Sequence, residues 1–200
     1  MWSLIVLLVP FAVSMTASPR PNNMIAMVSA TNFGFRRTVP VITGFVGGLA
    51  SMILAAGLGL GQVFVAWPEI HQLLKYVAIA YLLYLAWKIA RSGSAGKAEQ
   101  PTNPMSLMQG ALFQWINPKA WIVSISAITT FTAPQGDEVL QTLVITTVIF
   151  LVAFASVSTW ALFRTAIARI LCSSRALKIF NLSMAALLVV SLYPLVMAGY

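Results

Sequence analysis

Charged residues are scarce in this sequence, and acidic residues are the scarcest. Of its 200 residues, 8% are charged, and the 4 Asp and Glu are outnumbered by 12 Lys and Arg. A soluble domain has about 25% charged residues, whereas 60% of this chain is hydrophobic. This balance excludes a water-soluble globule, a disordered chain and a fibrous repeat, because none of them could keep so much apolar surface from water. The composition therefore indicates a membrane protein.

Cysteine and histidine are each present once, as Cys172 and His71. One cysteine permits no internal disulfide, and the two residues make neither a metal cluster nor a nucleophile with its base. We therefore predict no catalytic residue, no metal and no cofactor, and an intramembrane enzyme is the disfavoured alternative. All four acids are expected in loops or at helix ends, which leaves no obvious proton carrier within the spans. His71 is interpreted as a residue of a solvated outer loop.

Long stretches without charge divide the chain into six hydrophobic segments. Because about 20 apolar residues cross a hydrocarbon core, we expect transmembrane helices at about 2–33 with a break, 39–66, 73–90, 105–131 with a break, 139–163 and 177–197. The predicted fold class is all-α, a polytopic membrane protein with six transmembrane helices in a single transporter domain, residues 1–200.

The chain divides into two halves of three predicted helices each. Residues 1–90 form the first half, the Ser- and Gly-containing stretch 91–103 is expected to be a flexible cytoplasmic loop, and 104–200 form the second half. The second half therefore starts on the opposite side of the membrane from the first, and a 3+3 inverted repeat is geometrically available.

Basic residues lie almost entirely on one side of the predicted membrane. The odd-numbered connections carry nine cations and the other side carries only Lys75. By the positive-inside rule the odd-numbered connections are cytoplasmic, and both termini are periplasmic. Topology thus accounts for the net charge of +8, and no nucleic-acid partner is expected. The nine cations are Arg36, Arg37, Lys88, Arg91, Lys97, Arg164, Arg169, Arg175 and Lys178.

Two of the segments are too long for one straight crossing, and both contain proline. At 1.5 Å per residue, 2–33 would measure about 48 Å and 105–131 about 40 Å. Pro19 and Pro21 interrupt the first segment, and Pro118 interrupts the fourth. Interrupted helices at matching places in two halves point to a transporter binding site. The alternative is a pair of kinks that serve only packing.

Polar residues beside the two breaks are the candidate substrate-binding residues: Arg20, Asn22, Asn23, Gln114, Asn117 and Lys119. The amides can donate and accept hydrogen bonds, which suits a zwitterion, although they could instead satisfy backbone groups freed by the prolines. Arg20 could hold a substrate carboxylate in a wet cavity, or snorkel to an interface. Lys119 could act in the same way as Arg20, or line a cytoplasmic vestibule.

Four motifs resemble a known family. They are Pro19-Arg20-Pro21-Asn22-Asn23 and the stretches 29–37 (SATNFGFRR), 80–89 (AYLLYLAWKI) and 113–121 (FQWINPKAW). In these motifs, their order and its length, the chain resembles the lysine-exporter superfamily, and within it the homoserine/threonine-resistance branch. The resemblance covers essentially the whole chain. The family pattern at the first break is Pro-Gly-Pro-Asn, and Arg20 stands in the place of that glycine.

This resemblance implies a bacterial inner-membrane exporter of small amino acids or amino-acid derivatives, driven by the proton motive force and similar to cysteine and O-acetylserine exporters. The expected partners are a small amino-acid substrate and membrane lipid. A non-transporting membrane scaffold is the alternative if Arg20 closes the site, and an exporter of another small metabolite is a second one.

Glycines are spaced one helical turn apart in the second segment, as Gly44-x-x-x-Gly48 and Gly57-x-x-x-Gly61. Small residues at this spacing let a neighbouring backbone approach closely. We expect them to pack helices within one chain, with a homodimer contact as the alternative.

The predicted topology can be tested with single cysteines at Ser94 and Gln135 in a Cys172→Ser background. An impermeant thiol reagent applied to intact cells should label the cysteine at 135 and leave that at 94 unlabelled, because 94 lies on the cation-rich, cytoplasmic side. Labelling at 94 with protection at 135 would contradict the predicted orientation.

Overall fold

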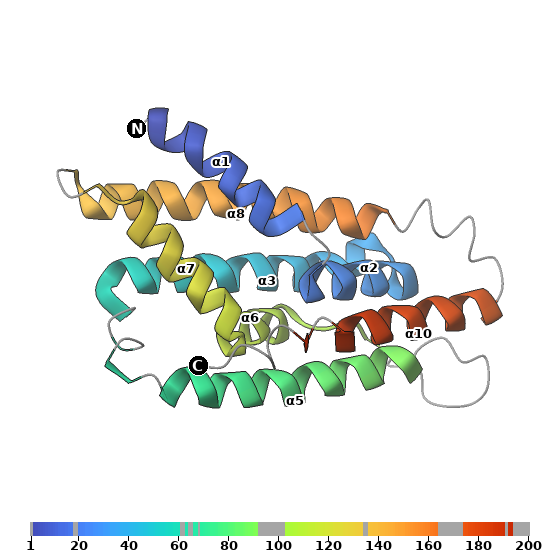
Figure 1. The fold of residues 1–200 in the computed structure, drawn as a ribbon. Helices are drawn as coiled ribbons and strands as arrows, with labels where there is room; N and C mark the ends of the chain where they lie inside the picture. Colours follow the sequence, from blue (N-terminus) through green and yellow to red (C-terminus); the bar gives the residue numbers. More distant parts are fainter. Residues whose placement is uncertain are drawn as a thin grey trace.

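The chain folds into helices throughout the part described by a computed structural model, which comprises residues 2–17, 20–60, 63, 66–67, 69–91, 103–133, 136–163, 174–190 and 192–193. In chain order the elements are α1 (Trp2–Ala17), α2 (Pro21–Phe33), α3 (Phe35–Ala55), the π-helical turn η1 (Ala56–Leu60), α5 (Glu69–Arg91), α6 (Leu107–Ile116), α7 (Pro118–Phe131), α8 (Glu138–Leu162) and α10 (Ser174–Val190) (Figure 1). The predicted all-α class is confirmed for these ranges.

The helices pack around α3 and α8. α3 contacts α2, α6, α7 and α8, while α1 and α2 pack on α8 and α10 packs on α5. Figure 1 shows the axes of α3, α5, α8 and α10 roughly aligned, with α1 and α7 crossing them obliquely. The main apolar core joins α2, α3, α5, α6, α8 and α10 and includes Ile42, Phe45, Leu85, Phe113 and Leu188.

Several helix ends, most of them cation-bearing, gather at one end of the molecule. The α2–α3 junction, the C-terminal ends of α5 and α8 and the start of α10 all lie on the right of Figure 1, whereas η1, the start of α5, the end of α7 and the start of α8 lie on the left. Helices that cross a membrane one after another must end on alternate sides of it, and this arrangement of helix ends meets that requirement.

Three described helices are long and apolar enough to cross a membrane: Phe35–Leu60, Gln72–Arg91 and Glu138–Leu162. The pair Leu4–Ala17 and Pro21–Phe33, bent by 60°, makes a fourth if it is one span, and Lys178–Val190 is a shorter apolar helix. These lengths and compositions fit a multi-pass membrane protein.

Several helix boundaries differ from the prediction. α5 begins at Glu69, so His71 lies in the first turn of a helix and its assignment to a loop was wrong. Glu69 lies in this first turn, where an acidic side chain interacts favourably with the positive end of the helix dipole. Arg36 and Arg37 likewise lie in the first turn of α3, because Gly34 alone, at φ 93°, separates α2 from α3.

The segment expected at 39–66 also ends earlier than predicted as a regular α-helix. α3 stops at Ala55 and gives way to η1, in which Gly59 has φ 96°. An α-helix cannot continue through a positive φ, which glycine adopts without steric cost. Most of the predicted loop 91–103 lies outside the described residues.

Glycines let the backbones of α3 and α6 come into direct contact. A Cβ at Gly48 would lie 2.9 Å from the carbonyl oxygen of Ala111, and one at Gly110 would lie 2.8 Å from that of Val41. A Cβ at Gly44 would collide with the backbone of Leu107. The predicted packing role within one chain is therefore confirmed for Gly44-x-x-x-Gly48, while Gly61 of the second motif lies outside the described residues.

Gly44→Ala should lower the stability of the folded protein by about 1–3 kcal/mol, because the added methyl group forces two backbones apart. Gly47→Ala is the matched control: nothing lies within 4 Å of a Cβ there, and alanine favours the helix by up to about 1 kcal/mol. Thermal unfolding in detergent checks this pair. Equal melting temperatures for the two variants would rule out the close contact.

Candidate functional site

The first helix break lies between α1 and α2. α1 ends at Ala17 and α2 begins at Pro21, with Arg20 as its N-cap in an extended conformation (φ −125°, ψ 160°). Proline is well suited to the first helical position, since its missing N–H would have no acceptor there. The Arg20 side chain makes no capping hydrogen bond, so it does not cap the N–H groups in the first turn of α2. Pro19 lies outside the described residues.

The second break lies between α6 and α7 and likewise has an extended residue followed by proline. Asn117 is extended (φ −78°, ψ 108°) and serves both as the C-cap of α6 and the N-cap of α7. Its Oδ1 accepts a hydrogen bond from the backbone N–H of Lys119 at 3.1 Å, and Pro118 opens α7. The predicted breaks at the proline motifs are therefore present in the described helices.

Both breaks face one large cavity, here called the central cavity, of about 570 Å³. Its apolar wall includes Phe45, Val46, Leu49, Ile149 and Val157. All six predicted polar residues line it: Arg20, Asn22, Asn23, Gln114, Asn117 and Lys119. The structure therefore brings together side chains from two motifs that lie far apart in the sequence. The volume falls within the range of about 300–1,000 Å³ that is common for small-molecule sites.

A hydrogen bond joins the two breaks directly. Asn22 Nδ2 donates to Gln114 Oε1 at 3.0 Å, across 92 positions of sequence. Gln114 is only 3% exposed, so this contact between the halves lies deep in the molecule. A buried hydrogen bond between two amide side chains stabilises the fold by about 0.5–1.5 kcal/mol, and leaving one of the two amides without a partner costs about 1–3 kcal/mol.

Side chains cover the carbonyl groups that the first break leaves at the end of α1. The carbonyl oxygen of Thr16 accepts from Asn23 Nδ2 at 2.8 Å and from Ser156 Oγ at 2.9 Å. That of Ala17 accepts from Trp160 Nε1 at 3.1 Å. Neither Ser156 nor Trp160 belongs to the predicted binding set. Their spacing of four residues puts them on one face of α8, but only the fold reveals what that face contacts.

The carbonyl groups at the end of α6 are covered in the same way. Trp121 Nε1 donates to the carbonyl oxygen of Trp115 at 3.0 Å, and the backbone N–H of Asn117 donates to that of Gln114 at 3.0 Å. The two tryptophan rings also pack edge to face, with centroids 5.2 Å apart. At both breaks, therefore, two carbonyls near the helix C-terminus accept internal hydrogen bonds, and first-turn residues of the following helix line the central cavity.

The central cavity is positive in character. Arg20, which is half-buried, and Lys119 line it, and no Asp or Glu is among its described lining residues. The guanidinium Nη2 of Arg20 lies 3.8 Å from the sulfur of Met15. No group of three or more His, Cys, Asp or Glu that could hold a metal occurs within the described ranges.

A family model for the LysE type translocator matches residues 13–196. This chain belongs to the LysE type translocator family. The match covers both helix breaks and all of the residues that line the central cavity except Phe11 and Ala12. It confirms the lysine-exporter family that the four motifs indicate, while the homoserine/threonine-resistance branch stays a prediction. No solved structure matches the chain.

Two curated relatives of this LysE-type chain carry the same name. The cysteine/O-acetylserine efflux protein of Salmonella choleraesuis (strain SC-B67) is 34% identical over 146 residues, which are 72% of this chain and 74% of that protein. The protein of the same name from Shigella boydii serotype 4 (strain Sb227) is 36% identical over 119 residues, 59% of this chain and 60% of that protein.

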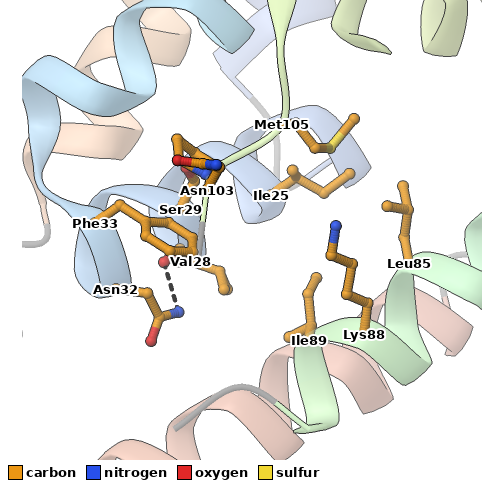
Figure 2. A pocket seen from close by; sticks show the side chains of 11 residues that line it. Ile25, Val28, Ser29, Asn32, Phe33, Leu85, Lys88, Ile89, Asn103 and Met105 are labelled. Atoms are coloured by element: carbon orange, nitrogen blue, oxygen red, sulfur yellow. Dashed lines mark hydrogen bonds between the residues drawn. The ribbon is translucent and has the colours of Figure 1, made fainter. Parts of the chain in front are cut away.

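A second, smaller pocket of about 60 Å³ lies between α2 and α5 in this LysE-type fold. Lys88 and Asn32 are among its lining residues, and none of the six predicted binding residues is. Figure 2 shows the Lys88 side chain extending from α5 toward Ile25 and Met105, while Asn32 Nδ2 donates to the carbonyl oxygen of Val28 at 2.9 Å. The predicted binding residues thus line the central cavity and not this second pocket.

Ser156→Ala and Trp160→Phe should each loosen the last turn of α1, because each removes a donor from a carbonyl at the break. The loss of about 0.5–1.5 kcal/mol per bond corresponds to about two- to tenfold faster hydrogen exchange at residues 12–17. Thr159→Ala is the control, since its hydroxyl bonds Ala155 of its own helix. Unchanged exchange in both test variants would contradict the role of α8 in holding the break.

Proposed function

We propose that this chain is a bacterial inner-membrane exporter of small amino acids or amino-acid derivatives, driven by the proton motive force. The observation that carries the proposal is the convergence of both proline breaks and six polar side chains on the central cavity. The names of its curated relatives, which are cysteine/O-acetylserine efflux proteins, support the same class of substrate.

The six polar residues would act together on the substrate. Arg20 and Lys119 would hold a carboxylate, and the amides of Asn22, Asn23, Gln114 and Asn117 would orient the rest of the molecule by hydrogen bonds. The apolar wall would accept a short side chain or acyl group. Hydrogen-bond donors fixed before the substrate arrives cost less to order on binding, which favours affinity.

Alternating access would use the two breaks as the moving parts. We propose six membrane spans arranged as a 3+3 inverted repeat, with the first and fourth spans interrupted at the substrate. The hydrogen bond between Asn22 and Gln114 supports this arrangement, because it couples the break of one half to the break of the other. A substrate that inserted between these amides would then act on both halves at once.

The proposed orientation has both termini in the periplasm. Its support is the gathering of the α2–α3 junction, the ends of α5 and α8 and the start of α10 at one end of the molecule (Figure 1). Except for the end of α8, these elements carry basic residues: Arg36, Arg37, Lys88, Arg91 and Arg175. An excess of Lys and Arg is typical of cytoplasmic helix ends. The proposed partners are the substrate and membrane lipid, with a homodimer as a further proposal and no nucleic acid.

Overproduction of the chain should raise the outflow of at least one small amino acid or derivative, and Asn117→Ala should abolish that gain. Asn117→Asp separates binding from helix capping, because it keeps the oxygen that accepts from the N–H of Lys119 and loses the NH₂ donor. We therefore expect Asn117→Asp to be as stable as the parent and still defective. Outflow and protein level are measured in the same cells.

Thr147→Ala is the control for loss of a polar group, since Thr147 is exposed and bonds the carbonyl of Leu143 in its own helix. It should export like the parent. If overproduction gives no more outflow of any tested amino acid or derivative than an empty vector, the export function is wrong and the non-transporting scaffold is preferred.

A further inference from the structure

The polar groups around the central cavity are unequally divided between hydrogen-bond acceptors and donors. Among the four amide side chains the internal bonds are balanced: the oxygens of Gln114 and Asn117 accept, and the NH₂ groups of Asn22 and Asn23 donate. The carbonyls at the end of α1 are also engaged, with two donors on Thr16. An ammonium group of a ligand would depend on the amide oxygens, because Arg20 and Lys119 line the cavity and accept no hydrogen bonds.

The donors are more abundant. A guanidinium offers five N–H groups and accepts none, and an ammonium offers three. Arg20 and Lys119 bring both kinds to the cavity wall. Gln114 and Asn117 each add an NH₂ group on the side chain whose oxygen already accepts an internal bond. This set of groups is suited to bind carboxylate or acyl oxygens.

Two helix N-termini add to the positive charge. The first-turn residues of α2 and of α7 line the central cavity, and a helix N-terminus carries about half a positive charge. The opposite ends of α1 and α6, which would bring partial negative charge, are covered by indole, hydroxyl and amide donors. Side chains and helix ends therefore favour the same sign of ligand charge.

We propose that the preferred ligand of the central cavity is an amino-acid derivative with net negative charge. It is a carboxylate whose amine is acylated, or one that carries a second acidic group, rather than a zwitterion. The inference rests on the proposed function and narrows its substrate class. A free ammonium would approach two cations and two helix N-termini, and like charges in one site repel.

The volume of the cavity agrees with this class. About 570 Å³ exceeds what the smallest amino acids fill and leaves room for an acyl group against the apolar wall. Arg20 supplies one of the two cations that line the cavity. A change of that residue therefore changes the charge of the site without removing the amides or Lys119.

The direct test compares O-acetyl-L-serine with N-acetyl-L-serine. The two isomers have the same molecular formula and both carry a carboxylate, but only O-acetyl-L-serine has a free ammonium group. Binding to the purified full-length chain in lipid nanodiscs is measured by calorimetry at mildly acidic pH, where the acetyl group does not migrate to the amine. Aspartate against asparagine is the parallel pair for a second acidic group.

We expect the net-negative member of at least one pair to bind about tenfold more tightly or better, the size of a single charge-assisted hydrogen bond. Arg20→Lys should keep most of that preference and Arg20→Gly should lose most of it. Arg37→Gln is the control, because it removes an exposed cation of α3 that does not line the cavity. It should bind like the parent.

Equal or tighter binding of the neutral member in both pairs would overturn the inference while leaving the export function standing. So would a preference that persists unchanged in Arg20→Gly and Lys119→Gln. Transport into proteoliposomes, measured with the same ligands, tests the export function itself. If no ligand moves in that assay although the net-negative member binds more tightly, the export function is wrong and the charge selectivity of the cavity is right.

Discussion

The structure depends on how two interrupted helices satisfy their backbone groups inside an apolar molecule. Hydrocarbon offers no hydrogen bonds to a freed N–H or C=O, so each interruption is tolerated only where protein or a wet cavity supplies partners. Here the two sides of each break are treated differently. The carbonyl ends of α1 and α6 receive side-chain donors, whereas the N-termini of α2 and α7 face the central cavity, where Asn117 caps one N–H of α7. These N-termini add to the positive charge that Arg20 and Lys119 bring to the cavity.

α8 supports the first break, and α3 joins the two halves. α8 contacts α1, α2 and α3, and its Ser156 and Trp160 bond the last turn of α1. α3 approaches α6 closely through Gly44, Gly48 and Gly110. Hydrogen bonds between membrane helices average about 0.6 kcal/mol, so a few such contacts hold the site while leaving it able to move.

Much of the site could be predicted from the sequence because the signals are local. Prolines within overlong apolar segments mark breaks wherever the rest of the fold lies, and polar residues beside them have few other reasons to be there. The helix starts at Glu69 and Phe35 were missed, since charged residues were assigned to loops. The bond from Ser156 to Thr16 spans 140 positions, and no periodicity in the sequence connects two residues so far apart. Whether donors or acceptors remain for a ligand depends on such distant bonds, so it follows only from the fold.

The most direct test of this account is an experimental structure of the full chain with N-acetyl-L-serine bound. We predict that the ligand lies in the central cavity, with its carboxylate within hydrogen-bond distance of Arg20 or Lys119 and beside the N-terminus of α2, and that Asn23, Ser156 and Trp160 still cover the end of α1. A ligand bound outside the central cavity, or an Arg20 side chain that reaches the lipid headgroups while the carboxylate contacts neither cation, would contradict it.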